Sequence, residues 1–183
     1  MIPAGLTQIA TGRSVIVALL LWFGAGFVLF QFGPYPELGV MTPGLELLDE
    51  RMGYTWTDVE IYFAVLGESG RRLYRVFLIA DLGNAILMAA AGSLLLAFLT
   101  TRSGLERTWF GIVAFIPLAA GTLDLLENTL LLIMLGQFPD IAESLAGAAS
   151  TTTTVKLWTG MTGVAAVAIG LVGWAVTAAG RRA

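Results

Sequence analysis

The amino-acid sequence contains no cysteine and no histidine. Without cysteine the chain can form no disulfide, no thiol nucleophile and no zinc–thiolate site. Without histidine it lacks the side chain best suited to proton transfer near neutral pH, which is also the commonest metal ligand. Any chemistry must therefore use Asp, Glu, Lys, Arg, Tyr, Ser or Thr, and we expect neither a metal site nor a cofactor.

Charged residues are also scarce. They make up 13% of the 183 residues, about half the fraction that is usual in soluble domains. The formal net charge is −3 and no basic run occurs, so the sequence gives no reason to expect a nucleic-acid partner. Hydrophobic residues make up 57% of the chain, and the mean hydropathy is +0.82. These values predict a membrane protein.

Four apolar stretches are long enough to cross a bilayer, which needs roughly 20 residues. They lie at about residues 14–32, 73–99, 109–135 and 154–179. No internal repeat or second domain is visible. The sequence thus predicts an all-α integral membrane protein in which residues 1–183 form a single domain, a four-helix transmembrane bundle.

Three local signals refine this prediction. The first stretch has a long apolar core and is followed by "FQFGPYPE", which offers no small-x-small cleavage site, so we expect a retained helix and not a signal peptide. Pro117 is expected to kink the third helix. The run "STTTT" at residues 150–154 is rich in capping side chains and predicts the start of the fourth helix.

The orientation follows from basic residues near the helix ends. With a cytoplasmic N-terminus, five arginines fall on the cytoplasmic side: Arg13, Arg102, Arg107, Arg181 and Arg182. The connection 136–150 carries no basic residue, as an outer loop should. The 34–72 connection carries Arg51, Arg71 and Arg72, mixed with seven acids. We predict that both termini are cytoplasmic, in a membrane of the bacterial inner (plasma) membrane type.

The 34–72 connection predicts two short amphipathic helices that lie in the membrane interface. The first would begin at Pro43, after a Thr42 cap. Its apolar face would consist of Leu45, Leu48 and Met52. The second would begin at a capping box of Thr57 and Glu60. Its apolar stripe would consist of Val59, Tyr62, Phe63 and Leu66.

Polar residues interrupt the third apolar stretch at "LAAGTLDLLENTLLL", residues 118–132. Asp124, Glu127 and Asn128 are spaced three and four residues apart, so they share one face of a helix. At about 1.5 Å per residue, Glu127 and Asn128 lie about 10 to 12 Å below the outer end of this helix. The same calculation places Asp81 of the second helix at about 12 Å and Lys156 nearer the outer end of the fourth. We therefore expect one polar layer in the outer half of the bilayer.

Ionisable groups at such depth face the bundle interior, because exposing one to lipid costs roughly 2.5 to 3.5 kcal/mol. Asp81 and Lys156 are thus the expected neighbours of the third-helix cluster, and Tyr74 and Asn84 share the stripe of Asp81. Tyr74 could donate a proton one turn above the cluster, although an interfacial tyrosine is the favoured interpretation. Arg71, Arg72 and Arg75 could reach inward and balance the charge of the acids. Contact of these three arginines with lipid headgroups is the favoured interpretation.

The charge count carries the functional prediction. One lysine cannot neutralise three buried carboxylates, so the site must hold a proton, a cation or a ligand. The leading hypothesis is a pocket that binds a lipid or other hydrophobic small molecule, with or without acid–base chemistry of an isomerase or hydrolase type. Asp124, Glu127 and Asp81 are the candidate catalytic residues. The candidate ligand-binding residues are Asn128, Asn84, Lys156, Tyr74 and Arg75.

Two alternatives stay open. A dimer could use the same acids as a proton- or cation-coupled carrier, although the inner halves of the four stretches have few polar residues. The chain could also be a non-catalytic subunit of a larger membrane complex in which the polar cluster fixes helix register. Polar contacts of this kind contribute about 0.6 kcal/mol on average in membranes.

The layout of four helices with carboxylates buried toward one side is similar to that of the EXPERA group, the sterol isomerase type. This chain departs from that group because it has no histidine and its first apolar stretch has no acid. None of the group's motifs can be placed on the sequence, so no family is assigned.

Overall fold

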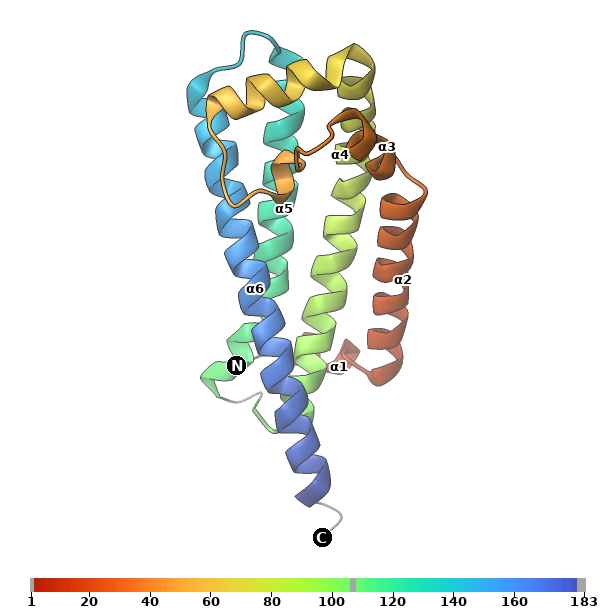
Figure 1. The fold of residues 1–183 in the computed structure, drawn as a ribbon. Helices are drawn as coiled ribbons and strands as arrows, with labels where there is room; N and C mark the ends of the chain where they lie inside the picture. The colour runs from red at the N-terminus through yellow and green to blue at the C-terminus, as the bar shows by residue number, and fades with distance from the viewer. Residues whose placement is uncertain (1, 106–107, 181–183) are drawn as a thin grey trace. The chain divides into compact units, whose positions relative to one another are not determined.

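The computed structural model describes residues 2–105 and 108–180, and every regular element in these residues is a helix (Figure 1). Arg107, Arg181 and Arg182, which entered the orientation argument, lie outside the described residues. The elements in chain order are α1 (Ala4–Ile9), α2 (Gly12–Gln31), α3 (Tyr35–Met41), the 3-10 helix η1 (Leu48–Glu50), α4 (Trp56–Arg102), the 3-10 helix η2 (Trp109–Phe115), α5 (Ile116–Gln137) and α6 (Glu143–Gly180).

Four helical segments of the described chain are long and apolar enough to cross a membrane. They are Gly12–Met41, Trp56–Arg102, Phe110–Gln137 and Glu143–Gly180. The prediction of an all-helical chain with four such segments is therefore confirmed. The second and fourth helices are longer than expected, because each continues beyond its apolar stretch at its N-terminal end.

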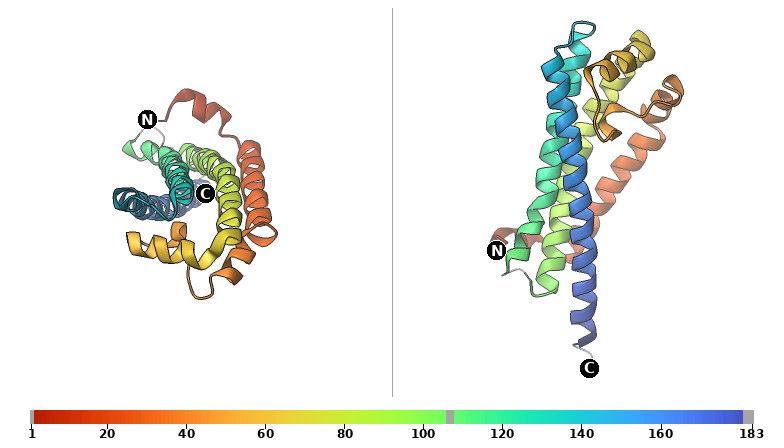
Figure 2. Two further views of the ribbon diagram at one scale, coloured as in Figure 1. Left: turned by 90° about the horizontal axis from the view of Figure 1, so that it is seen from above. Right: turned by 60° about the vertical axis from the view of Figure 1, so that its left-hand side comes forward.

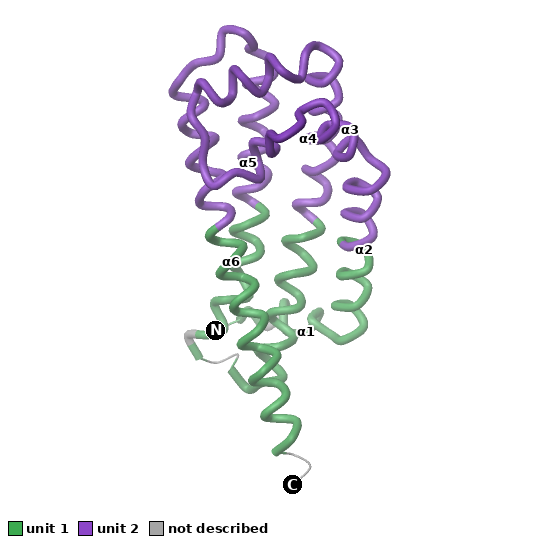
Figure 3. The backbone as a smooth tube through the Cα atoms, viewed as in Figure 1, with its two compact units in different colours: residues 1–22, 87–121, 158–183 green, residues 23–86, 122–157 purple. Residues whose placement is uncertain are grey.

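The chain divides into two compact units, which Figure 3 distinguishes by colour. Unit 1 comprises residues 1–22, 87–121 and 158–183, and unit 2 comprises residues 23–86 and 122–157. The helices α2, α4, α5 and α6 each contribute residues to both units.

In unit 2, the end of α5 and the start of α6 lie side by side, joined by a short turn (Figures 1 and 2). The helix α4 has a break at Gly67, where φ is 62° and ψ is −173°. A positive φ is tolerated by glycine because it has no Cβ. Residues 56–66 therefore form a separate helical arm, which packs over the α5–α6 turn through a hydrogen bond from Trp56 Nε1 to the Ile141 carbonyl (2.9 Å).

The core of unit 2 is rich in aromatic side chains. Tyr62, Phe63, Tyr74 and Phe77 are all buried. Tyr74 and Phe77 are stacked with an interplanar angle of 12°, and Tyr62 meets Tyr74 edge to face at 5.6 Å. Edge-to-face and offset-stacked pairs are the geometries that aromatic quadrupoles favour. This packing holds the helical arm against the part of α4 that follows Gly67.

Unit 1 has a smaller core built from small and aliphatic side chains. Its buried members are Ile2, Ala10, Leu96, Ala97, Val113, Ala114 and Ala166. Close approach depends on glycine at two points. A Cβ on Gly92 would lie 2.7 Å from Pro117 Cβ, and one on Gly170 would lie 3.1 Å from Leu99 Cβ. Small residues allow helices to pack at such distances.

The expected kink at Pro117 is wrong. Residues 109–115 form the 3-10 helix η2, and α5 begins at Ile116, so Pro117 is the second residue of an α-helix. Proline is favoured in a first helical turn because the N–H that it lacks would have no helical partner there. Pro117 therefore helps to start a helix where the sequence pattern predicted an interruption.

The first predicted interfacial helix is also absent. Thr42 ends the helix α3 and does not begin another, because its hydroxyl donates to the Leu38 carbonyl at 3.0 Å. Residues 43–47 contain no helix, and η1 follows at Leu48–Glu50. The second amphipathic segment does form, as the arm at the start of α4. Its four predicted stripe residues, Val59, Tyr62, Phe63 and Leu66, are all buried.

Two predicted helix starts are displaced. The cap of α4 is formed by Thr55 and Asp58 and not by Thr57 and Glu60: Asp58 Oδ2 accepts from Thr55 N at 2.7 Å, and Thr55 Oγ1 accepts from Asp58 N at 3.2 Å. The "STTTT" run lies inside α6, which begins at Glu143. The hydroxyls of Thr151, Thr152 and Thr154 donate to carbonyls four residues earlier, for example Thr154 to Ser150 at 3.0 Å, which is how threonine satisfies its hydroxyl inside a helix.

Candidate functional site

Lys156 of α6 lies at the centre of a buried polar cluster in unit 2. Its ammonium group donates to Asp124 Oδ1 at 3.1 Å and forms an ion pair with Glu127 Oε2. A second hydrogen bond runs to the backbone carbonyl of Asp49 at 3.1 Å. The ammonium group, which has three donor protons, thus has three oxygen neighbours. Lys156 therefore joins α5, α6 and the 34–55 connection at one point.

Glu127 is the most enclosed carboxyl group of the cluster. Its exposed fraction is 0%, and its second oxygen, Oε1, accepts a hydrogen bond from the Thr153 hydroxyl. Thr153 and Lys156 are three residues apart on α6, so they present both groups on one face. The helical spacing of α6 thus explains why one carboxylate meets a hydroxyl and an ammonium group together.

Asp81 of α4 accepts hydrogen bonds from two amides. Asn84 Nδ2 donates to Asp81 Oδ1 at 3.1 Å, and Asn128 Nδ2 donates to Asp81 Oδ2 at 3.0 Å. Both carboxylate oxygens therefore have a donor. The amide oxygens Oδ1 of the two asparagines are buried and have no hydrogen-bond partner among the described residues. They are acceptors that a bound molecule could use, because a buried polar group without a partner is costly.

Asp49 reaches the cluster from the connection. It lies on η1 between Leu48, which is buried, and Glu50, which is exposed, and its Oδ1 accepts from the Tyr74 hydroxyl at 2.9 Å. The segment is held in place beyond η1, where Tyr54 N donates to Ser150 Oγ at 2.8 Å. The connection therefore folds into the unit and adds a fourth carboxyl group. We call the complete set the carboxyl network: Asp49, Tyr74, Asp81, Asn84, Asp124, Glu127, Asn128, Thr153 and Lys156.

The network holds four carboxyl groups and the chain's only lysine. Burial raises the pKa of Asp49 to about 6, although the charge of Lys156 and the Tyr74 hydroxyl both act in the opposite direction. Asp49 therefore changes its protonation state within the physiological range, which an ordinary aspartate does not.

The nearby arginines of unit 2 do not supply the missing positive charge. Arg51 donates to the Glu46 carbonyl, Arg71 donates to the Phe63 carbonyl, and Arg72 pairs with Glu68 at 2.9 Å. Arg75 is exposed. Within residues 2–105 and 108–180, the ion pairs of the network carboxylates are those with Lys156. The excess of acid is therefore a property of the folded unit as well as of the sequence.

Most of the predicted site residues meet in this network. Asp124, Glu127, Asn128 and Lys156 are in mutual contact or adjacent as expected, and Asp81 joins them through Asn128 and Asn84. Arg75 is not brought to the network. The preference for an interfacial Tyr74 is wrong, because its side chain has an exposed fraction of 0% and is covered by the connection.

Sequence reasoning missed Asp49 and Thr153. Asp49 lies in the segment for which the sequence predicted a first amphipathic α-helix and was not named as a site residue, but the 3-10 turn buries both Leu48 and Asp49. No local signal distinguishes it from its acidic neighbours. Thr153 was interpreted as a capping residue. Its spacing of three from Lys156 was the available signal, because residues three apart share a helix face.

The described residues show no group of three or more carboxylates placed to hold a metal ion, since Lys156 occupies the position between Asp124 and Glu127. A pocket of about 580 Å³ opens in unit 2 beside the segment that carries Asp49. Its lining includes Tyr35, Thr42, Glu46, Leu47 and Glu50, and none of the carboxyl network.

Comparison with known proteins gives no relative: no protein-family model matches the chain, and no match was found among curated proteins or solved structures. The resemblance in layout to the EXPERA group is thus unsupported by any match, and the functional argument depends on the geometry of the site.

Proposed function

We propose that this chain is an integral membrane protein whose carboxyl network binds a lipid-like or other hydrophobic small molecule and exchanges a proton with it. The observation that carries the proposal is the buried set of four carboxyl groups around one lysine. Carboxyl groups held in excess over cations suit proton exchange, because the charge that Lys156 does not balance can be balanced by a bound proton.

Membrane insertion is supported by apolar side chains that face outward. On α2 the exposed fractions are 60% for Ile16, 68% for Leu20, 61% for Phe23 and 60% for Phe27. These residues are spaced three or four apart, so they form one continuous apolar face. A face of this kind is unfavourable in water and favourable against lipid. The arginines favour an orientation with both termini in the cytoplasm.

The roles within the network follow from its contacts. Asp124 and Glu127 share Lys156, so the lysine can hold one of them ionised while the other carries a proton. Asn84 and Asn128 hold Asp81 through their amide N–H groups and retain free acceptor oxygens. A ligand with a hydroxyl or N–H group could therefore be oriented by these oxygens beside the acids.

The distribution of buried polar groups favours a one-sided site over a transmembrane carrier path. Among the described residues, all the buried ionisable side chains belong to unit 2. The buried polar residues of unit 1 are Ser93 and Thr100, and Thr100 donates to a carbonyl of its own helix. A proton path through both units would need ionisable groups or water-lined polar surface in each of them.

The proposal is tested by native mass spectrometry of the protein purified in detergent, beside its Asp124→Asn and Glu127→Gln variants. We expect a discrete small-molecule adduct on the wild type that both variants lose. Glu68→Gln is the matched control, because Glu68 is exposed in the same unit and, among the described residues, pairs with Arg72 and not with the network; it should retain the adduct.

Two results would contradict the proposal. An adduct retained equally by all four proteins would place the ligand elsewhere. If the wild-type protein carries no adduct and is stable only together with a co-purified partner chain, the role of a structural subunit is favoured. Thermal unfolding of each variant is measured in parallel, so that loss of ligand is distinguished from loss of fold.

A further inference from the structure

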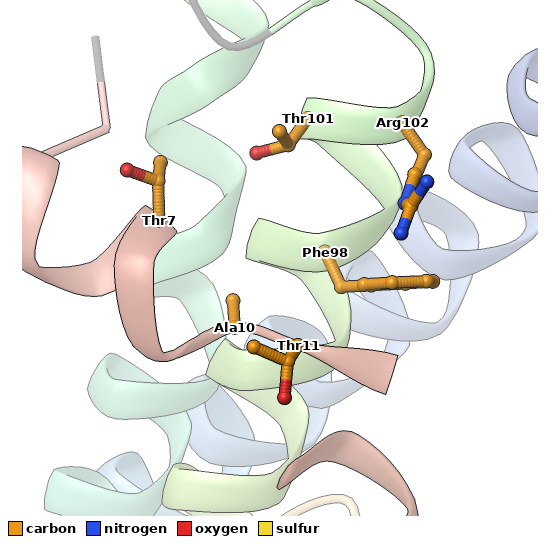
Figure 4. Close-up of a pocket in the computed structure, with 6 residues that line it drawn as sticks. All are labelled: Thr7, Ala10, Thr11, Phe98, Thr101 and Arg102. Atoms are coloured by element: carbon orange, nitrogen blue, oxygen red, sulfur yellow. The ribbon is translucent and has the colours of Figure 1, made fainter. Parts of the chain in front are cut away.

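The described part of unit 1 contains a pocket that the carboxyl network does not involve. Its volume is about 400 Å³, which is at the small end of the range of about 300 to 1,000 Å³ for ligand sites. Its lining comprises Thr7, Ala10, Thr11, Phe98, Thr101 and Arg102 (Figure 4). The pocket thus combines one guanidinium group with three hydroxyl groups, all of which can donate hydrogen bonds.

The guanidinium group of Arg102 contacts an aromatic ring and has no polar partner among the described residues. It lies over the Phe98 ring, with Cζ 5.2 Å from the ring centroid (Figure 4). Among residues 2–105 and 108–180 it forms no hydrogen bond or ion pair. Its five N–H donors are therefore available to a bound anion, for which a planar guanidinium is well shaped.

The ring below Arg102 is itself fixed by packing. Phe98 meets Trp174 of α6 edge to face at 6.1 Å, and a Cβ added to Gly12 would lie 3.8 Å from the Phe98 ring. Arg102 therefore rests on a surface built from three helices of unit 1. Contact with this ring limits the positions open to the guanidinium group, so less conformational entropy is lost when an anion binds.

The charge of unit 1 also favours an anion. The sequence of its three segments contains five arginines and one glutamate, so its formal charge is +4. Unit 2 contains twelve acids, four arginines and one lysine, so its formal charge is −7. The two values sum to the −3 of the whole chain. An anion is thus attracted to the unit that contains the pocket and repelled from the other.

We propose that this pocket binds a phosphate group, and that the phosphate belongs to the headgroup of an anionic lipid. A guanidinium with several hydroxyls is a donor set suited to phosphate oxygens. The lipid source is favoured because apolar residues are exposed beside the pocket: Ile9, next to the lining residue Ala10, is 59% exposed, and Ile16 of α2 is 60% exposed. Acyl chains could lie along these side chains while the phosphate enters the pocket.

The test is a titration of delipidated protein with phosphatidylglycerol in detergent, read by native mass spectrometry. Phosphatidylcholine, which is zwitterionic and has no net charge, is the comparison. Arg102→Gln should weaken phosphatidylglycerol binding about tenfold, the value of one charge-assisted hydrogen-bonded contact. Arg13→Gln is the matched control. Arg13 is exposed in unit 1 and does not line the pocket. Its substitution removes the same charge as Arg102→Gln but leaves the pocket lining unchanged, so the Arg13→Gln variant should bind like the wild type.

The outcomes separate the pocket from general attraction and from a soluble ligand. Equal weakening by Arg102→Gln and Arg13→Gln would overturn the proposal, because the net charge and not the pocket would then decide binding. Equal binding of both lipids, with no competition by inorganic phosphate, would overturn it as well. A third outcome is that inorganic phosphate competes, that Arg102→Gln abolishes this competition, and that phosphatidylglycerol is not preferred over phosphatidylcholine. This result would support phosphate recognition by the pocket, overturn the lipid source and identify the soluble ion as the ligand. Because Arg102 is exposed, the variant should keep its unfolding temperature.

Discussion

Replacing Lys156 by methionine removes the only cation of the carboxyl network and keeps most of the side-chain volume. In the native unit the ammonium group lies 3.1 Å from Asp124 Oδ1 and is also paired with Glu127. At an effective dielectric constant of about 20, a pair at this distance attracts by about 5 kcal/mol. Part of this value is offset because the lysine no longer has to be desolvated.

The net loss expected for Lys156→Met is about 3 to 5 kcal/mol, the usual result of leaving a buried charge without its partner. This is well above the ~0.6 kcal/mol of an average polar contact in a membrane. For a chain of this size it corresponds to a fall of roughly 10 °C in the unfolding temperature. Thermal unfolding in detergent, followed by intrinsic tryptophan fluorescence, measures the change.

Two further variants make the result interpretable. Arg72→Met breaks the Arg72–Glu68 pair, whose side chains are 73% and 77% exposed, and should cost less than about 1 kcal/mol. Adding Asp124→Asn and Glu127→Gln to Lys156→Met should restore most of the stability, because neither of the two carboxylates that pair with Lys156 then remains. A Lys156→Met protein as stable as Arg72→Met would refute the view that the carboxylates depend on this lysine.

Two other predictions concern Asp49 and the start of α4. The pKa of Asp49 is raised from 3.8 to about 6 in the folded unit, so between these two values the folded state binds more protons than the unfolded state. The free energy of unfolding should therefore fall as the pH rises from about 4 to about 6. The contribution of this group is at most about 3 kcal/mol. Asp49→Asn should flatten that part of a stability profile measured by chemical unfolding across this pH range, and an unchanged profile would contradict the burial of the carboxyl group. Thr55→Ala should cost about 1 kcal/mol through loss of the helix cap, whereas Thr57→Ala should cost only a few tenths. Unfolding temperatures of the two variants decide between the observed cap and the one that the sequence pattern suggested.

Much of the site was readable from the third and fourth helices. Asp124, Glu127 and Asn128 share a face because the helical repeat is fixed, and Lys156 reaches the same layer because the rise per residue is fixed. The cost of exposing charge to lipid then requires these groups to turn inward. These arguments use only covalent geometry and solvation, so they need no knowledge of the tertiary structure.

The path of the connection was not readable in the same way. The sequence pattern around Leu48 allowed an amphipathic α-helix, yet the structure has a 3-10 turn that buries Asp49 against Tyr74 and Lys156. The segment after this turn is tied to α6 by a hydrogen bond from Tyr54 N to Ser150 Oγ, about a hundred residues later in the chain. Contacts of this kind have no local sequence signal, because they form only when distant segments are already packed together.

The sequence by itself therefore determined the helical class, the four apolar segments and the common layer of Asp81, Asp124, Glu127 and Lys156. Tertiary structure alone decided that Asp49 and Thr153 complete the network, that Tyr74 is buried, and that Arg102 faces a pocket. The physical reason is the range of the interactions: helix geometry and the exclusion of charge from lipid act within one segment, whereas the fourth carboxyl group and the anion pocket arise from segments that are remote in sequence and meet only in the folded chain.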